Sequence, residues 1–206
     1  MKIHRRTTLH RCPRSLRVSA RALQYFSIAL AATVSLLAAA NEMRPGNVYQ
    51  LTFTDIDRQQ LSTADGHVSV ITVVTRKDEH KAQAVGDNFP RAYVGDPKYR
   101  LIQLVSFQQN ILPPFRGMVG AIIRSRLNAE AKELQKTYAA KHINRDARHD
   151  IFVIADFDGK AVSQLGIAPT SNDFAVFVFD GRGRLVRRWN DVPPAEALAA
   201  AINEAR

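Results

Sequence analysis

The sequence predicts an α/β domain, a mixed β-sheet flanked by helices, after an N-terminal signal segment. Apolar, β-branched runs at residues 68–74 and 101–107 predict central strands, because their apolar character on both faces is typical of strands covered on two sides. Helical stretches lie between the successive strands, which implies parallel pairing. Residues 180–183 (Asp-Gly-Arg-Gly) join apolar runs at 174–179 and 185–189 and predict a closing antiparallel hairpin.

The first half of the domain is read from shorter patterns. Alternation of apolar and polar residues over 49–54 predicts a half-buried strand, and Asp65-Gly66 predicts a turn. Asp78 and Glu79 are acids of the kind that begin a helix, and this helix should end before Pro90. The sheet core is predicted to include Val70, Ile71, Val73, Leu101, Ile102, Leu104, Val153, Val176 and Val178.

In the second half, Pro113-Pro114 is expected to break the chain ahead of a long amphipathic helix over 118–138. Residues 151–155 predict another strand, which a turn at 156–159 ends, and Pro193-Pro194 opens a C-terminal helix. The apolar stripe predicted for the long helix consists of Val119, Ile122, Ile123, Leu127, Ala131, Leu134 and Tyr138.

The N-terminus has the pattern of an export signal. Residues 1–21 carry seven Lys or Arg and no acid, and residues 22–40 are apolar or small and close on three alanines. These features predict a signal peptide over residues 1–40 that is cleaved after Ala40. The alternative is an uncleaved anchor, since about 20 apolar residues can span a bilayer. In both cases the positive-inside rule places the body outside the cytoplasm.

The body is predicted to consist of a linker over 41–46 and one domain over 47–206. The whole chain has a net charge of +10, but the body has 22 Lys and Arg against 19 Asp and Glu and is close to neutral. The basic signal therefore accounts for most of the high pI, and no nucleic-acid partner is expected. The only cysteine is Cys12, so the body has no disulfide and depends on packing alone.

Three segments together resemble the thioredoxin-like superfamily, and are most similar to its peroxiredoxin and periplasmic thiol-disulfide branches. They are residues 51–75 (strand, Asp-Gly turn and first central strand), 151–167 (IFVIADFDGKAVSQLGI) and 174–189 (FAVFVFDGRGRLVRRW). Their order and spacing extend the resemblance from Tyr49 to the C-terminus. The resemblance implies a thioredoxin-like sheet with flanking helices.

The chain departs from this family at its reactive positions. The family's cysteine follows the first central strand at a helix N-terminus, where amide dipoles lower the thiol pKa. The matching residues here, 75–81, read Thr-Arg-Lys-Asp-Glu-His-Lys. The family's cis-proline stands before the hairpin strand, but no proline lies near Phe174, and Pro169 is too far upstream. A body without cysteine cannot form a mixed disulfide or a sulfenic acid, so neither thiol-disulfide nor peroxidase activity is expected.

Two interpretations remain for the former active-site position. Arg76, Asp78 and His80 are candidate catalytic residues of a non-thiol site, with His80 as base and Arg76 as anion clamp. Alternatively, Asp78 and Glu79 only cap a helix, because acids are favoured in its first turn. As a binding surface, the candidates at this position are Thr75, Arg76 and His80.

Other polar clusters are weaker candidates. His142, Asp146, His149 and Asp150 offer zinc-ligand chemistry, but a solvated loop after the long helix is the preferred interpretation. Residues 156–159 lack the later ligands of a calcium loop and are read as a turn. No metal or cofactor is predicted. A basic hairpin patch, which either binds an acidic partner or protects a strand edge, consists of Arg182, Arg184, Arg187 and Arg188.

These observations favour a non-catalytic binding or accessory protein of the cell envelope, with an envelope protein as partner. Membrane contact is expected only through an uncleaved N-terminal segment. The alternative is an enzyme related to thioredoxin or peroxiredoxin that uses a non-thiol site at the former active-site position.

Overall fold

A computed structural model of the chain describes residues 42–206. The predicted signal segment and its cleavage site after Ala40 lie outside the described residues. The segment expected to be a linker contacts the domain: Met43 is buried, and the Gly46 N–H donates to the Leu185 carbonyl (2.7 Å). Within residues 42–206, no helix is both long and apolar enough to cross a membrane.

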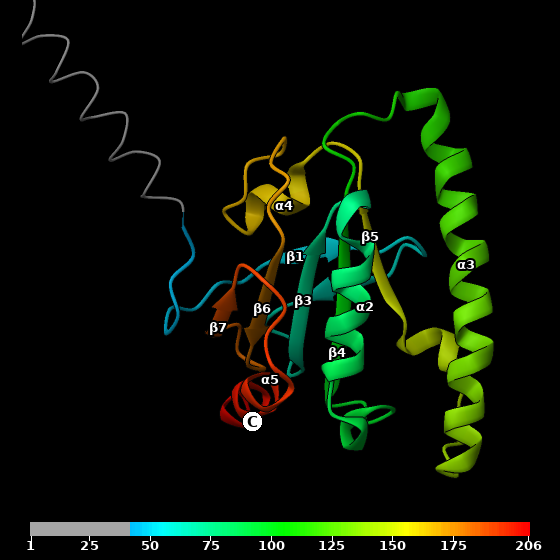
Figure 1. Cartoon of the computed structure of the whole chain (residues 1–206), viewed down its shortest axis with the longest axis vertical. Coiled ribbons are helices and arrows are strands. Elements are labelled where there is room, and N and C mark those ends of the chain that lie inside the picture. Colours follow the sequence, from blue (N-terminus) through cyan, green and yellow to red (C-terminus); the bar gives the residue numbers. More distant parts are fainter. Residues whose placement is uncertain (1–41) are drawn as a thin grey trace, which may run out of the picture. The chain divides into compact units, whose positions relative to one another are not determined.

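Five strands form one mixed sheet in the order β5-β4-β3-β6-β7 (Figure 1). The central strand β3 (Val68–Val74) pairs in parallel with β4 (Tyr99–Ser106), which pairs in parallel with β5 (Phe152–Asp156). On its other side, β3 pairs antiparallel with β6 (Ala175–Phe179), which continues into the antiparallel edge strand β7 (Leu185–Trp189). The predicted parallel pairing and closing hairpin are therefore confirmed.

One face of the sheet is covered by helices that follow the central strand and the hairpin. β3 leads through the 3-10 turn η1 (Arg76–Asp78) into α2 (Glu79–Asn88), and the chain ends in α5 (Ala195–Glu204). Both helices bury their apolar side chains, such as Val85 and Leu198, against the β3 residues that include Val70 and Val74.

The opposite face is covered by smaller elements. Ile71 and Val73 of β3 point to it and pack with residues of the short helix α4 (Lys160–Gln164). A two-stranded hairpin of β1 (Thr52–Thr54) and β2 (Gln60–Ser62) contributes Phe53 and Leu61 to the same core. The mixed sheet with helices on both faces has the thioredoxin-like architecture that the resemblance implied.

The predicted sheet core is largely confirmed. Of the nine residues named, all but Leu101 are buried. Leu101 is half-buried because it faces a groove between α2 and the helix α3 (Pro113–Ala140).

The long helix α3 (Pro113–Ala140) differs from the prediction in two respects. It begins at Pro113, so the two prolines start the helix instead of breaking the chain, as the first-turn position of proline allows. Only Leu127, Ala131 and Tyr138 of the predicted stripe are buried, and Ile122 is 51% exposed. The reason is that α3 packs chiefly against the 3-10 turn η3 (Ala147–Asp150), and Figure 1 shows it standing at the side of the sheet beyond β5.

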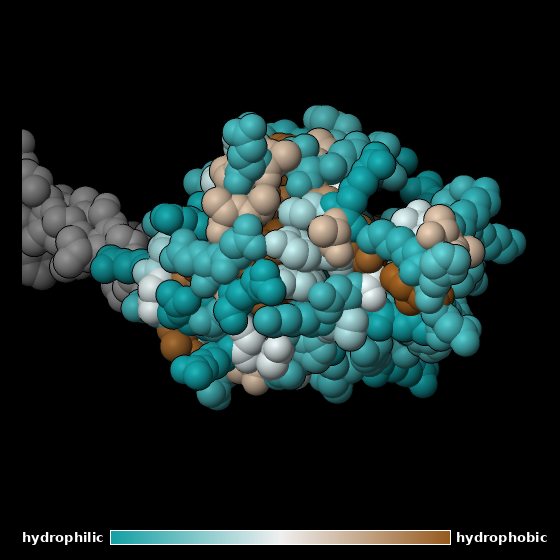
Figure 2. Space-filling view, turned by 90° about the horizontal axis from the view of Figure 1, so that it is seen from below, coloured by the Kyte–Doolittle hydropathy of each residue, from teal (hydrophilic) through white to brown (hydrophobic). Residues whose placement is uncertain are grey.

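The surface at the lower end of the molecule is mainly polar. Figure 2 shows this face, onto which α5 and the C-terminal end of α3 project, with separate apolar spots in a largely hydrophilic surface. No broad apolar patch is visible on this face. Contacts made here would therefore be mostly polar.

Candidate functional site

The former active-site position is a closed turn at the start of α2. Thr75 is 4% exposed, and its hydroxyl donates to Asp78 Oδ2 (2.8 Å), while the Asp78 N–H donates to the Thr75 carbonyl (3.0 Å). Arg76 and His80 are exposed beside this turn. Within residues 42–206, no hydrogen bond or ion pair links either of them to Asp78. The structure thus brings the predicted residues to one corner, with Asp78 engaged by Thr75.

Lys81 fixes the start of α2 to its surroundings. Its Nζ lies 2.9 Å from Asp191 Oδ1 and 5.2 Å from the centre of the Phe174 ring. Hydrogen bonding by Lys81 lowers the pKa of the Asp191 carboxyl below its usual value. The corner is consequently held by contacts that do not use Arg76 or His80.

A groove of about 590 Å³ runs beside this corner, between α2 and α3. Its floor is the sheet face of β3, β4 and β5, and its lower end is closed by the loop around η2 (Arg91–Tyr93) and by η3. The side chains of α2 that line it follow helical spacing: Glu79, Ala82, Gln83, Gly86 and Asp87. Neither Thr75 nor Arg76 nor His80 lines the groove.

The floor of the groove carries two polar side chains on an otherwise apolar sheet face. Thr72 of β3 and Gln103 of β4 are register partners, and both line the groove. Thr72 is 3% exposed, and within the described residues its hydroxyl has no hydrogen-bond partner. A buried hydroxyl without a partner costs about 1–3 kcal/mol, so this position is unfavourable unless something enters the groove to pair with it.

The lining is strongly acidic. It contains a single guanidinium, Arg145, and the five carboxylates of Glu79, Asp87, Asp96, Glu130 and Asp150. Burial raises the pKa of the Glu130 carboxyl, and the charge of Arg148 only partly opposes this. The groove therefore concentrates negative charge in a domain that is nearly neutral overall.

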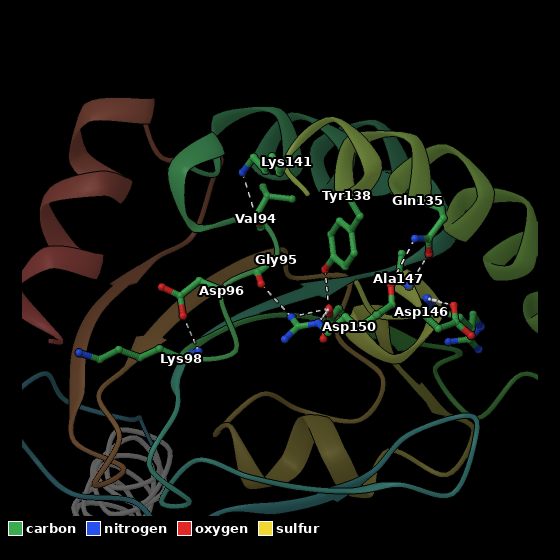
Figure 3. A network of polar contacts seen from close by, with 12 residues as sticks. Val94, Gly95, Asp96, Lys98, Gln135, Tyr138, Lys141, Asp146, Ala147 and Asp150 are labelled. Carbon is green, nitrogen blue, oxygen red and sulfur yellow. Dashed lines mark hydrogen bonds and ion pairs between the residues drawn. The ribbon is translucent and has the colours of Figure 1, made fainter. Parts of the chain in front are cut away.

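A polar network closes the lower end of the groove (Figure 3). Figure 3 shows the Tyr138 ring pointing from α3 towards Asp150, to which its hydroxyl donates. Arg145 donates to the same carboxylate (2.8 Å from Nε) and to the Gly95 carbonyl (2.9 Å), and Lys141 donates to the Val94 carbonyl (2.9 Å). Burial, followed by the bond to Asp150, raises the pKa of Tyr138 to about 12. The network holds the end of α3 against the loop after η2.

The four residues considered for zinc do not form a ligand set. Helix α3 ends before His142, so His142 and Asp146 do not share a helical face. Asp146 accepts a hydrogen bond from the Arg148 N–H (2.9 Å), His149 is exposed, and Asp150 belongs to the network. Among residues 42–206, no three His, Cys, Asp or Glu side chains lie close enough to hold a metal ion.

Two further polar features have structural partners. Asp156 is buried and accepts hydrogen bonds from the N–H groups of Gly159 and Val162 (2.9 Å each), which supports its interpretation as a turn that begins α4. Several hairpin arginines form ion pairs with nearby acids: Arg184 with Asp180, Arg187 with Glu204, and Arg188 with Glu42.

Sequence reasoning missed the groove, because its lining comes from α2, α3, η3 and three strands. One signal was present in the sequence: each of the two central apolar runs contains a polar residue, Thr72 in VSVITVV and Gln103 in LIQLVSF. Parallel pairing with matched register places these two residues side by side.

Comparison with solved structures found several similar chains. The chain is similar to the exposed lipoprotein thioredoxin Etrx1 of Streptococcus pneumoniae (11% identity, TM-score 0.47, 75% of this chain and 98% of that one). It is also similar to a DsbF homologue from Corynebacterium diphtheriae (16% identity, TM-score 0.47, 78% of this chain and 87% of that one). A third similar structure is a thiol:disulfide interchange protein of the thioredoxin family from Chlorobium tepidum (11% identity, TM-score 0.45, 80% of this chain and 98% of that one). No protein-family model and no curated protein sequence matches the chain. At these identities the similarity concerns the fold.

Proposed function

We propose that this chain is an exported, non-catalytic binding or accessory protein of the cell envelope. One observation carries the proposal. Where thiol-dependent thioredoxin-like proteins need a cysteine, this chain has the buried Thr75, hydrogen-bonded to Asp78. Thiol chemistry requires a thiolate nucleophile, so the fold here serves as a scaffold, and the function lies in what its surface binds.

Export is the part of the proposal that the N-terminal sequence supports. The basic stretch, the apolar stretch and the closing alanines of residues 1–40 are the features of a cleaved signal. Intact-mass analysis of the protein recovered from the envelope should give a chain beginning at Asn41. Recovery of the full chain from the membrane fraction would instead make residues 22–40 an anchor.

The exposed side chains of the closed turn are the proposed contact surface. Arg76 and His80 can be replaced without touching the bond between Thr75 and Asp78. The mature chain and its Arg76→Ala/His80→Ala variant would be used to capture partners from an envelope extract of the source organism. A matched control replaces an exposed arginine and histidine elsewhere, Arg44 and His149.

We expect capture to fall at least fivefold in the corner variant and to persist in the control variant. Equal capture by all three proteins would mean that the corner is only the capped start of a helix.

A further inference from the structure

We propose that the groove between α2 and α3 binds an extended organic dication, such as a polyamine or a peptide segment with two basic side chains. This inference rests on the proposed binding function and assigns it a second site and a ligand class. None of the candidate residues at the former active-site position (Thr75, Arg76, Asp78 and His80) lines this groove.

The first observation is uncompensated negative charge. Asp150 is neutralised by Arg145, which leaves Glu79, Asp87, Asp96 and Glu130 on the lining. Glu79 lies 3.6 Å from Arg126, but both side chains are 73% exposed, and exposed pairs of this kind interact weakly. The four remaining acids are exposed, and their combined negative charge along the groove would attract a cationic ligand.

The second observation is the unpaired hydroxyl on the floor. Thr72 Oγ1 is buried at the base of the groove and lacks a partner within the described residues. An ammonium or guanidinium N–H is a donor that such a hydroxyl accepts readily. The partly exposed amide of Gln103 lies next to it, in register on β4. The floor therefore holds an unpaired hydroxyl beside a partly exposed amide, and the amide is the group that a ligand entering from the open side meets first.

The spacing of the acids fits an extended ligand. Glu79 and Asp87 are eight residues apart on α2, or about 12 Å along the axis at 1.5 Å per residue. Side chains on the same face of an extended peptide that are four residues apart are separated by about 13 Å. Glu130 faces this span from α3. The carboxylates are too dispersed to chelate a single metal ion.

The surfaces between the acids suit the carbon chain of such a ligand. Ala82, Leu101 and Leu134 line the middle of the groove. Lysine stems and polyamine methylenes pack on apolar surface while their charged ends remain near polar groups. At the lower end, the half-buried ring of Tyr93 lines the groove, with one face stacked on Tyr99, and adds aromatic surface for such a chain.

The test is calorimetric titration of the mature chain at low salt with three ligands. They are spermidine, a short peptide with lysines at positions i and i+4, and the same peptide with the two lysines adjacent. We expect the spaced peptide or spermidine to bind at least tenfold more tightly than the adjacent-lysine peptide, and 0.5 M NaCl to weaken binding strongly. Binding of spermidine alone identifies a free polyamine as the source of the dication, and binding of the spaced peptide alone identifies a basic polypeptide segment.

Paired variants assign the binding to the groove. Glu130→Gln should weaken it about five- to tenfold, whereas Glu133→Gln, on the same helix but paired with Lys136 outside the groove, should not. Thr72→Val should weaken it about three- to tenfold, and Thr72→Ser, which keeps the hydroxyl, should restore it. Ser69→Ala removes a buried hydroxyl on the opposite face of β3 and should leave binding unchanged.

Absence of binding by all three ligands, or equal loss in Glu133→Gln and Glu130→Gln, would overturn the proposal. If partner capture at the corner persists in that case, the proposed binding function stands and only the groove assignment fails.

Discussion

Replacement of Thr72 by valine should stabilise the protein. Thr72 is 3% exposed on the central strand, at the floor of the groove, and its hydroxyl has no hydrogen-bond partner within the described residues. A buried hydroxyl without a partner costs about 1–3 kcal/mol in proteins. Valine has nearly the same shape and is also β-branched, so it suits the strand. We expect a gain of about 1–2 kcal/mol in the free energy of unfolding, which for a domain of this size raises Tm by about 2–8 °C.

Urea and thermal unfolding of the mature chain, followed by circular dichroism, measure this gain. The urea m-value should not change, because the surface exposed on unfolding is the same. Ser69→Ala should also stabilise the domain, by a smaller amount since it loses volume, and it should leave ligand binding intact. A loss of about 1 kcal/mol in Thr72→Val would refute the reasoning, since it would mean that the hydroxyl is paired in solution, for example with groove water.

Two further substitutions test the loops that shape the domain. Gly95 has φ +84°, and a Cβ there would lie 2.5 Å from Ile143 Cδ1, so Gly95→Ala should lower stability by about 1–2 kcal/mol; an unchanged Tm would show that the end of the groove relaxes freely. Burial alone would raise the pKa of Asp65, but its hydrogen bonds, including one from Arg100, outweigh burial and lower it. Wild type should therefore have a larger free energy of unfolding than Asp65→Asn. This difference should be at its full size above pH 3.8 and should shrink as the pH falls below that value. A difference independent of pH between 2 and 7 would show that the charge of Asp65 is not responsible.

The sheet was predictable because its strands carry strong local signals. The run Val68–Val74 is apolar on both faces, and the structure buries every residue of it. The hairpin turn at 180–183 fixes the antiparallel edge in the same way. Strand β2 was missed, since three residues with one apolar side chain, Leu61, give no periodicity to detect.

The long helix shows where local patterns mislead. Apolar residues at helical spacing predict a helix but do not identify the surface that covers them. Ile122 belongs to the predicted stripe, yet it is exposed because α3 contacts η3 along its C-terminal half and not the sheet along its whole length. The prolines at 113–114 are compatible with either a chain break or a helix start. The structure shows a helix start, because α3 begins at Pro113.

The two sites differ in how far the sequence specifies them. The corner at Thr75–His80 follows directly from its position after the first central strand, so its location was predictable. The groove depends on the distance between α2 and α3, which is set by tertiary contacts such as the network around Arg145. The sequence signals for the groove were Thr72 and Gln103, which are polar residues within apolar strands.

Turnover by the purified mature chain tests the central claim most directly, namely that this thioredoxin-like domain works without thiol chemistry. Insulin reduction in the presence of dithiothreitol and consumption of hydrogen peroxide would be measured for wild type and His80→Ala. We predict rates equal to the protein-free background for both proteins, because the position after β3 holds Thr75 bonded to Asp78 and the body has no cysteine. A wild-type rate above background that His80→Ala abolishes would contradict the account and make the corner a non-thiol active site.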